Sequence, residues 1–175
     1  HTNVITDDLV AIWDAANRKG YPGTGEVWTD LVGGHNGTLD NGPTFDSANG
    51  GSIVFDGTDD EIVCGNGDFI EGLTEITACC WVFVEDAGSA YPKVISKGHA
   101  SGFDCGITRG SEVIWCYIAS NELSAYIPGF EEWFYFVFRY KSGETNGMQL
   151  WINGESKNTA TITAAIPSDS SNLFL

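Results

Sequence analysis

Short runs in which apolar and polar residues alternate recur along the chain and are separated by glycine-rich turns. This period of two predicts β-strands, because successive side chains of a strand point to opposite faces of a sheet. No window combines a sustained helical repeat with capping residues. We predict strands at residues 9–14, 52–56, 60–64, 75–84, 93–97, 103–108, 113–119, 133–140, 148–153 and 157–163. In residues 17–51, where turn residues dominate, we expect loops with short strands.

The clearest hairpin runs through residues 103–118, around the symmetric turn Arg109-Gly110-Ser111-Glu112. This turn favours a register in which Cys105 faces Cys116 on an apolar face of the sheet. The opposite face then carries polar groups beside large rings, with Asp104, Gly106 and Thr108 set against Tyr117, Trp115 and Val113.

A similar alternation follows in residues 133–140, where alternate phenylalanines predict a core face. The other face of this strand carries Trp133, Tyr135, Val137 and Arg139. Residues 148–152 repeat the pattern before Asn153-Gly154, a strong signal for a two-residue hairpin turn. Gln149 and Trp151 then lie on the mixed face of that strand.

Composition agrees with an all-β domain and limits the partners. The 175 residues fit one domain, and 22 glycines with a 13% aromatic share suit a two-sheet sandwich. The net charge of -16 argues against nucleic acid and against an anionic membrane, because phosphate groups are bound by clustered Lys and Arg. No stretch reaches the roughly 20 apolar residues that a membrane helix needs, so we expect no membrane insertion.

The order of these segments resembles the concanavalin A-like superfamily, in particular its laminin G-like jelly-roll domains from secreted bacterial proteins and marine phage virion proteins. The resemblance is carried by residues 9–14, 28–31, 35–38, 42–45, 53–60, 76–82, 94–98 and 150–154, and by the strand that begins at Trp133. It implies an all-β, two-sheet antiparallel jelly-roll sandwich and an extracellular or virion location. Residues 43–60 look especially like domains of phage virion proteins, which implies a tail, fibre or capsid-decoration role. Such domains usually continue past the strand that ends here at Leu175, so we expect residues 1–175 to be one domain that lacks its last strand.

Catalytic motifs are not evident in the sequence. Enzymes of this superfamily that cut β-glucans share a Glu-x-Asp-x-x-Glu strand, and no strand here carries it. Glu131 and Glu132 are adjacent, so their side chains point to opposite faces of a strand. The histidines have no nucleophile elbow nearby, and the cysteines lack the Cys-x-x-Cys spacing of a zinc site. We therefore expect a domain that is not an enzyme, with polysaccharide degradation as the third hypothesis.

Two features leave alternatives open. Asp56, Asp59 and Asp60 offer several oxygens in one tight turn, which suits calcium, and many lectin-like relatives hold a structural calcium ion. The alternative is that these carboxylates only accept backbone hydrogen bonds within the turn. Cys105 and Cys116 are the one pair that the register positions for a disulfide, but buried free cysteines are also common.

Sugar binding needs flat rings beside planar polar groups. If the strands pair as expected, one sheet's outer, concave face carries Asp104, Trp115, Tyr117, Tyr135, Arg139, Gln149 and Trp151. The leading hypothesis is a module that binds glycans or a host surface through this face, with Tyr21, Tyr91 and Tyr126 on loops as rival contacts. The alternative is a structural virion or adhesin domain whose faces contact other protein subunits, where Tyr, Trp and Arg are also enriched.

Overall fold

The computed structural model describes residues 7–86, 88 and 90–175 of the chain. These residues form two compact units, of which the first ends at Gly65 and also includes Phe174. The second runs from Asn66 to Leu173 and also includes Leu175. A single domain over residues 1–175 stays a prediction.

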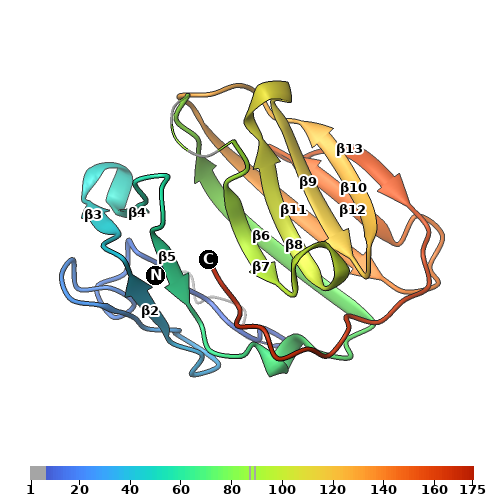
Figure 1. Cartoon of the computed structure of the whole chain (residues 1–175), viewed down its shortest axis with the longest axis horizontal. Coiled ribbons are helices and arrows are strands. Elements are labelled where there is room, and N and C mark those ends of the chain that lie inside the picture. The colour runs from blue at the N-terminus through green and yellow to red at the C-terminus, as the bar shows by residue number, and fades with distance from the viewer. Residues whose placement is uncertain (1–6, 87, 89) are drawn as a thin grey trace. The chain divides into compact units, whose positions relative to one another are not determined.

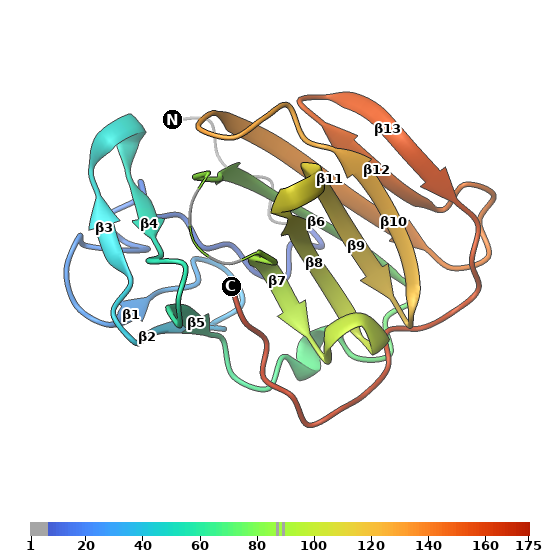
Figure 2. The same ribbon diagram turned by 45° about the horizontal axis from the view of Figure 1, so that its top comes forward.

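The second unit contains two four-stranded antiparallel sheets (Figures 1 and 2). One sheet has the strand order β10-β9-β8-β7 and the other the order β13-β12-β11-β6. Their strands are β6 (Glu75–Phe83), β7 (Lys93–Lys97), β8 (Phe103–Thr108), β9 (Val113–Ile118), β10 (Asn121–Tyr126), β11 (Trp133–Lys141), β12 (Met148–Ile152) and β13 (Glu155–Ala160). Three short 3-10 turns accompany them, at η2 (Asp68–Ile70), η3 (His99–Ser101) and η4 (Arg109–Ser111).

The inner faces of these two sheets form the core of a β-sandwich. Phe103 of β8 stacks on Phe138 of β11, with ring centroids 6.1 Å apart, so the two sheets are in direct contact. The buried side chains are Phe103, Cys105, Ile107, Ile114, Cys116, Ile118 and Leu123 from one sheet, and Phe134, Phe136, Phe138, Tyr140, Met148, Leu150 and Ile152 from the other. Each large apolar side chain buried in this way contributes on the order of 1.5–3 kcal/mol.

The predicted hairpin register is confirmed. Cys105 lies opposite Cys116, with Ile107 opposite Ile114. Asn153 and Gly154 form the two-residue turn between β12 and β13, both with positive φ, as this turn type requires.

Strand β10 was missing from the predicted strands. A two-residue turn of Ala119 and Ser120 leads into it, and both residues have positive φ, which is uncommon for residues other than glycine, asparagine and aspartate. This turn therefore carries none of the usual sequence signals. Leu123 is the one residue of β10 that is buried, so the strand also lacks a clear apolar alternation.

The first unit consists of short strands within loops, as predicted for residues 17–51. Its strands are β1 (Val27–Trp28), β2 (Gly37–Asp40), β3 (Thr44–Asp46), β4 (Ser52–Val54) and β5 (Glu61–Val63), with the 3-10 turn η1 (Ala48–Gly50). Strands β1, β2 and β5 form one sheet, and β3 pairs with β4. Phe174 makes an isolated antiparallel bridge to Val63.

The strand predicted at residues 9–14 is wrong. These residues form no strand, because the carboxylate of Asp30 takes the place of a sheet partner and accepts the backbone N–H of Ile12 at 2.8 Å. Asp30 also accepts the backbone N–H groups of Val32, Gly33 and His35. Burial would raise the pKa of Asp30, but these four donors together hold it below its ordinary value.

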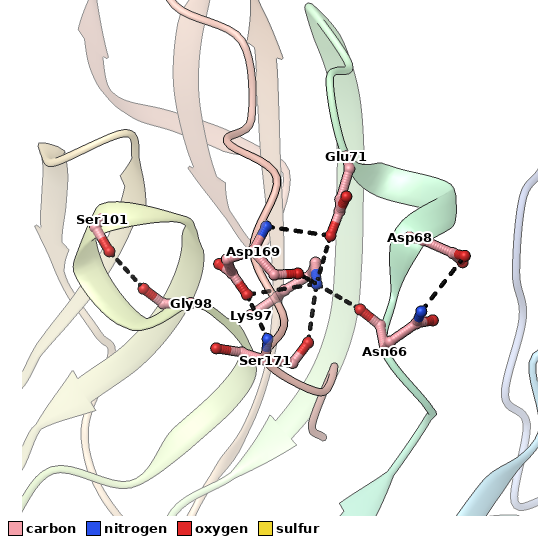
Figure 3. A network of polar contacts seen from close by, with 8 residues as sticks. All are labelled: Asn66, Asp68, Glu71, Lys97, Gly98, Ser101, Asp169 and Ser171. Carbon is pink, nitrogen blue, oxygen red and sulfur yellow. Dashed lines mark hydrogen bonds and ion pairs between the residues drawn. The ribbon is translucent and has the colours of Figure 1, made fainter.

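A buried lysine anchors the C-terminal segment within the second unit (Figure 3). Lys97, at the end of β7, is 1% exposed, and its Nζ donates to the backbone carbonyls of Asn66 and Ser171. The same ammonium lies 2.9 Å from Glu71 Oε1 and 3.6 Å from Asp169 Oδ1. One cation thus joins the end of β7 to residues that lie far away in sequence on both sides.

Within the described residues, no helix has the length and apolar character that crossing a membrane requires.

Candidate functional site

The predicted sugar-binding residues do not share one sheet. Asp104, Trp115 and Tyr117 lie on β8 and β9, whereas the other four predicted residues, Tyr135, Arg139, Gln149 and Trp151, lie on β11 and β12. These strand pairs belong to different sheets of the second unit. The expectation of one continuous face is therefore wrong, because residue alternation predicts the face of a strand and not the sheet that the strand joins.

Asp104 is the centre of the first group and is fully buried. Its Oδ2 accepts a hydrogen bond from Lys93 Nζ at 2.6 Å, and His99 Nδ1 lies 3.5 Å from the same oxygen. Its Oδ1 is buried and has no hydrogen-bond partner among the residues that the structure describes. Lys93, which sequence analysis did not single out, is the residue that balances this carboxylate.

Of the two rings of the first group, Trp115 is covered and Tyr117 is only partly buried. Trp115 is 8% exposed, and its indole occupies the space above Gly106, where an added Cβ would lie 2.6 Å from the ring. Lys93 Nζ lies 4.2 Å from the indole centroid, a cation–π contact on the ring face. Tyr117 donates its hydroxyl proton to Glu122, and this hydrogen bond raises the pKa of Tyr117 to about 12. The Trp115 ring is therefore closed to a stacking ligand.

Tyr135 and Trp151 of the second group belong to a larger set of rings on the outer face of their sheet, which we name the aromatic face. It consists of Trp81 and Phe83 on β6, Trp133 and Tyr135 on β11, and Trp151 on β12. Trp133 pairs with Phe83, and Tyr135 pairs with Trp81, with ring centroids 5.6 Å and 5.3 Å apart. Trp151 follows one row further, opposite Val137. Trp81 is 62% exposed, so its ring is open to solvent.

Polar side chains continue the same sheet surface beyond the rings. Arg139 lies between Thr77 and Gln149 in the next row of the sheet. The guanidinium of Arg139 donates to Glu144 Oε2 at 2.7 Å, and this hydrogen bond holds the pKa of Glu144 below its usual value. In the last row Lys141 lies 2.9 Å from the carboxylate of Glu75. Both cations of this surface are thus matched by carboxylates.

Trp81 and Phe83 were not among the predicted site residues, although the sequence carried a usable signal. Residues 75–84 alternate like the other strands, and the structure shows β6 with an exposed outer face along its whole length. Pairing of β6 with β11 places these two rings beside Trp133 and Tyr135. That pairing joins segments about fifty residues apart and is not readable from local patterns.

The aspartate turn has the geometry that both earlier interpretations require. Ligand oxygens of Asp56, Asp59 and Asp60 all lie within 4.8 Å of one another, close enough for one cation. The same carboxylates also serve the turn, since Asp60 accepts the N–H of Asp56 and Asp56 accepts that of Thr58. Calcium at this turn stays a prediction, and a calcium-dependent rise in Tm that Asp59→Asn abolishes would establish it.

All five cysteines are free thiols. Cys105 and Cys116 lie opposite each other in the core. Burial, followed by the hydrogen bond with Cys116, raises the pKa of Cys105 well above its usual value. Cys79 is exposed on the outer face of β6, and its hydrogen bond to Tyr135 raises the pKa of that tyrosine to about 12.

No known family model matches the chain, and no curated protein matches it. The fold is similar to solved structures. Domain 4 of AbnA, a GH43 extracellular arabinanase from Geobacillus stearothermophilus, in complex with arabinotriose, has a TM-score of 0.57 and 19% identity, with 83% of this chain and 75% of that chain covered. The binding domain of botulinum neurotoxin serotype D/C has a TM-score of 0.61 and 13% identity. A structure of the botulinum neurotoxin DC binding domain with SialylT has a TM-score of 0.58 and 14% identity.

The similar regions differ in extent. The chain is covered to 98% and 95% by the two neurotoxin structures but spans only 43% of the length of each. At these identities the likeness concerns the fold alone. The chain is an all-β protein with a two-sheet antiparallel sandwich of the jelly-roll kind.

Proposed function

We propose that this chain is a non-catalytic carbohydrate-binding module that contacts its ligand through the aromatic face. The observation that carries the proposal is the exposed indole of Trp81, which is 62% accessible and lies 5.3 Å from the ring of Tyr135. Exposed aromatic rings grouped in this way mark binding surfaces, because isolated soluble domains rarely expose contiguous apolar patches. Sugar rings present an apolar face to such rings and hydroxyl groups at their edges.

The polar end of the same surface supports a sugar ligand. Gln149 offers a planar amide, and Thr77 on β6 offers a hydroxyl group in the same row. Rows of outward side chains along a strand are about 6.8 Å apart, twice the rise per residue. Three rows of rings followed by one polar row therefore suit a glycan chain of several units.

The charges of this surface favour neutral glycans over anionic ones as ligands. Arg139 is paired with Glu144 and Lys141 with Glu75, so neither cation of this surface is available for a carboxylate or sulfate group. The chain as a whole carries a net charge of -16, which repels anionic polysaccharides at low salt. The arabinanase domain of similar fold was solved with arabinotriose, a neutral oligosaccharide, which agrees with this choice.

The arrangement of the carboxylates on this surface supports the proposal of a module that binds its ligand without cleaving it. Glycoside hydrolysis uses two carboxyl groups that face each other across the scissile bond. Glu75 and Glu144 are instead held in ion pairs with Lys141 and Arg139 of β11. Glu131, next to the aromatic face in sequence, accepts the backbone N–H of Asp86.

Replacing Trp81 by alanine tests the proposal. Calorimetric titration with neutral arabino-, xylo- and gluco-oligosaccharides should give at least about tenfold weaker binding in Trp81→Ala, the loss expected for a central interface ring. Phe55→Ala is the control, because Phe55 is an exposed ring of the first unit and belongs to no strand of this sheet. Binding that is equal in wild type and Trp81→Ala, with Phe55→Ala also unchanged, would reject the aromatic face as the contact.

The finer setting that we propose is a phage tail, fibre or decoration protein outside the cell, where the module meets a host surface. It is supported by the resemblance of residues 43–60 to phage virion domains. The competing function, a structural virion or adhesin domain without sugar binding, is favoured by the same exposed rings, since Trp, Tyr and Arg are common in protein interfaces. A negative glycan array together with a particle map that places the aromatic face against another subunit would decide for that competitor.

A further inference from the structure

A cleft lies where the edge strands of the two sheets of the second unit come together. Strand β10 ends one sheet and β13 ends the other, and Asn158 on β13 donates to the backbone carbonyl of Ser124 on β10 at 2.8 Å. Two hollows of about 420 Å³ and 510 Å³ lie here and share Tyr126 and Lys157 in their walls. Their size falls within the range of small-molecule sites, roughly 300–1,000 Å³.

The walls of this edge cleft combine one open ring with apolar contacts and polar groups. Tyr126 is 75% exposed, the most exposed large hydrophobic side chain among the described residues. Ile127 and Pro128 follow it in the first hollow, where the buried Ile152 also contributes. The first hollow is completed by Asn153, Glu155 and Lys157 from the β12–β13 hairpin.

The polar groups of the edge cleft are arranged for a neutral ligand with hydroxyl groups. Asn153 Oδ1 accepts the backbone N–H of Tyr135 at 2.9 Å, which fixes the amide and leaves its NH₂ group as a donor. Lys157 Nζ lies 2.7 Å from Glu155 Oε2, so this pair presents donors and acceptors without net charge. A ring for stacking, a fixed amide donor and a self-neutralised ion pair together match a sugar better than an anion or an apolar molecule.

The edge cleft is distinct from the aromatic face. None of the cleft residues belongs to the aromatic face, and Tyr126 lies on the opposite sheet from Trp81. Asn153 is the nearest link, because its side chain is bonded to the backbone of Tyr135, whose ring belongs to the aromatic face.

We infer that the edge cleft is a second sugar-binding site, which takes a short neutral oligosaccharide or the end of a neutral glycan chain. This inference rests on the proposed function, since it gives the same module a second contact with the same ligand class. Two sites on one module raise the apparent affinity for a polysaccharide above that of either site alone, because the second contact becomes intramolecular.

The experiment compares the wild type with Tyr126→Ala, Trp81→Ala and the double variant. Neutral arabino-, xylo- and gluco-oligosaccharides of three and six units are titrated by calorimetry, and backbone amide shifts are followed by NMR. The wild type should show a stoichiometry near two, each single variant near one, and the double variant no binding. Tyr126→Phe keeps the ring and should retain the second site, and unchanged thermal melting of Tyr126→Ala shows that the exposed change leaves the fold intact.

The possible results separate the two proposals. If the stoichiometry is one, and Trp81→Ala abolishes binding while Tyr126→Ala does not change it, the edge cleft is overturned and the aromatic face is kept. Binding that Tyr126→Ala abolishes and Trp81→Ala leaves intact keeps the cleft and overturns the aromatic face. Shifts at Asn153 and Lys157 that vanish in Tyr126→Ala support the cleft, and ligand shifts confined to β6 and β11 count against it.

Discussion

Replacing the buried Lys97 by methionine should release the C-terminal segment and destabilise the protein. Methionine keeps the apolar stem but removes an ammonium that lies 2.9 Å from Glu71 Oε1 and donates to the carbonyl of Ser171 at 2.9 Å. Removing one partner of a buried charge pair typically costs about 3–5 kcal/mol. Glu71 is 19% exposed and can regain water, so we expect the lower end, about 3 kcal/mol. For a chain of this size that corresponds to a fall in Tm of roughly 6–12 °C.

Urea denaturation followed by circular dichroism measures this loss as a lower midpoint. Hydrogen exchange should also become faster in residues 161–173 and around Glu71, because Lys97 joins these segments to β7. The matched control is Lys141→Met, which removes a lysine whose ion pair with Glu75 is solvent-exposed. Exposed pairs contribute little, so this variant should keep the wild-type midpoint. Equal midpoints for Lys97→Met and Lys141→Met would refute the anchoring role of Lys97.

Three further outcomes are expected. The hydrogen bond from Lys97 lowers the pKa of Glu71, so the ion pair stabilises the protein fully above pH 4.5, and this stability is lost as the pH falls through the lowered pKa of the folded protein. Glu71→Gln should therefore flatten the fall of Tm in acid, and an unchanged acid profile would contradict this. Gly106→Ala places a Cβ 2.6 Å from the Trp115 ring and should cost about 1–3 kcal/mol, with altered near-UV dichroism; a wild-type midpoint would count against it. Iodoacetamide should modify the exposed Cys79 in the native protein and spare the buried Cys105, so equal modification by mass spectrometry would speak against the described burial.

The hairpin of residues 103–118 could be predicted in detail because its information is local. A symmetric turn and strict alternation determine which side chains face each other, and the structure has Cys105 opposite Cys116 as expected. The strand prediction for residues 9–14 was wrong because the partner of this segment is not local. Its apolar residues look like a strand, but its backbone partner is the side chain of Asp30, which local alternation does not reveal.

The candidate site could be predicted only in part because sheet membership is not local. Tyr135 and Trp151 were predicted to lie with Trp115, and each of them does point away from the core of its own strand pair. Which strands join β11 is decided by contacts far apart in sequence, and β6 brings Trp81 to Tyr135. The predicted set therefore divides between two sheets, and two of the five rings of the aromatic face enter from β6, a strand that was predicted but was not expected beside β11.

Trp115 and Trp81 look alike in sequence, but Trp115 is buried and Trp81 is exposed. The residue opposite each tryptophan explains this difference. Trp115 lies opposite Gly106, which has no side chain, so the indole fills the empty position and Lys93 from β7 covers it. Trp81 lies opposite Tyr135 on the edge strand β6, where the partner position is already filled by a ring. Its indole therefore stays 62% exposed. A tryptophan paired with glycine inside a sheet is thus expected to be closed to ligand, whereas one paired with another ring at a sheet edge is expected to be open. This difference favours Trp81 over Trp115 as the proposed sugar contact.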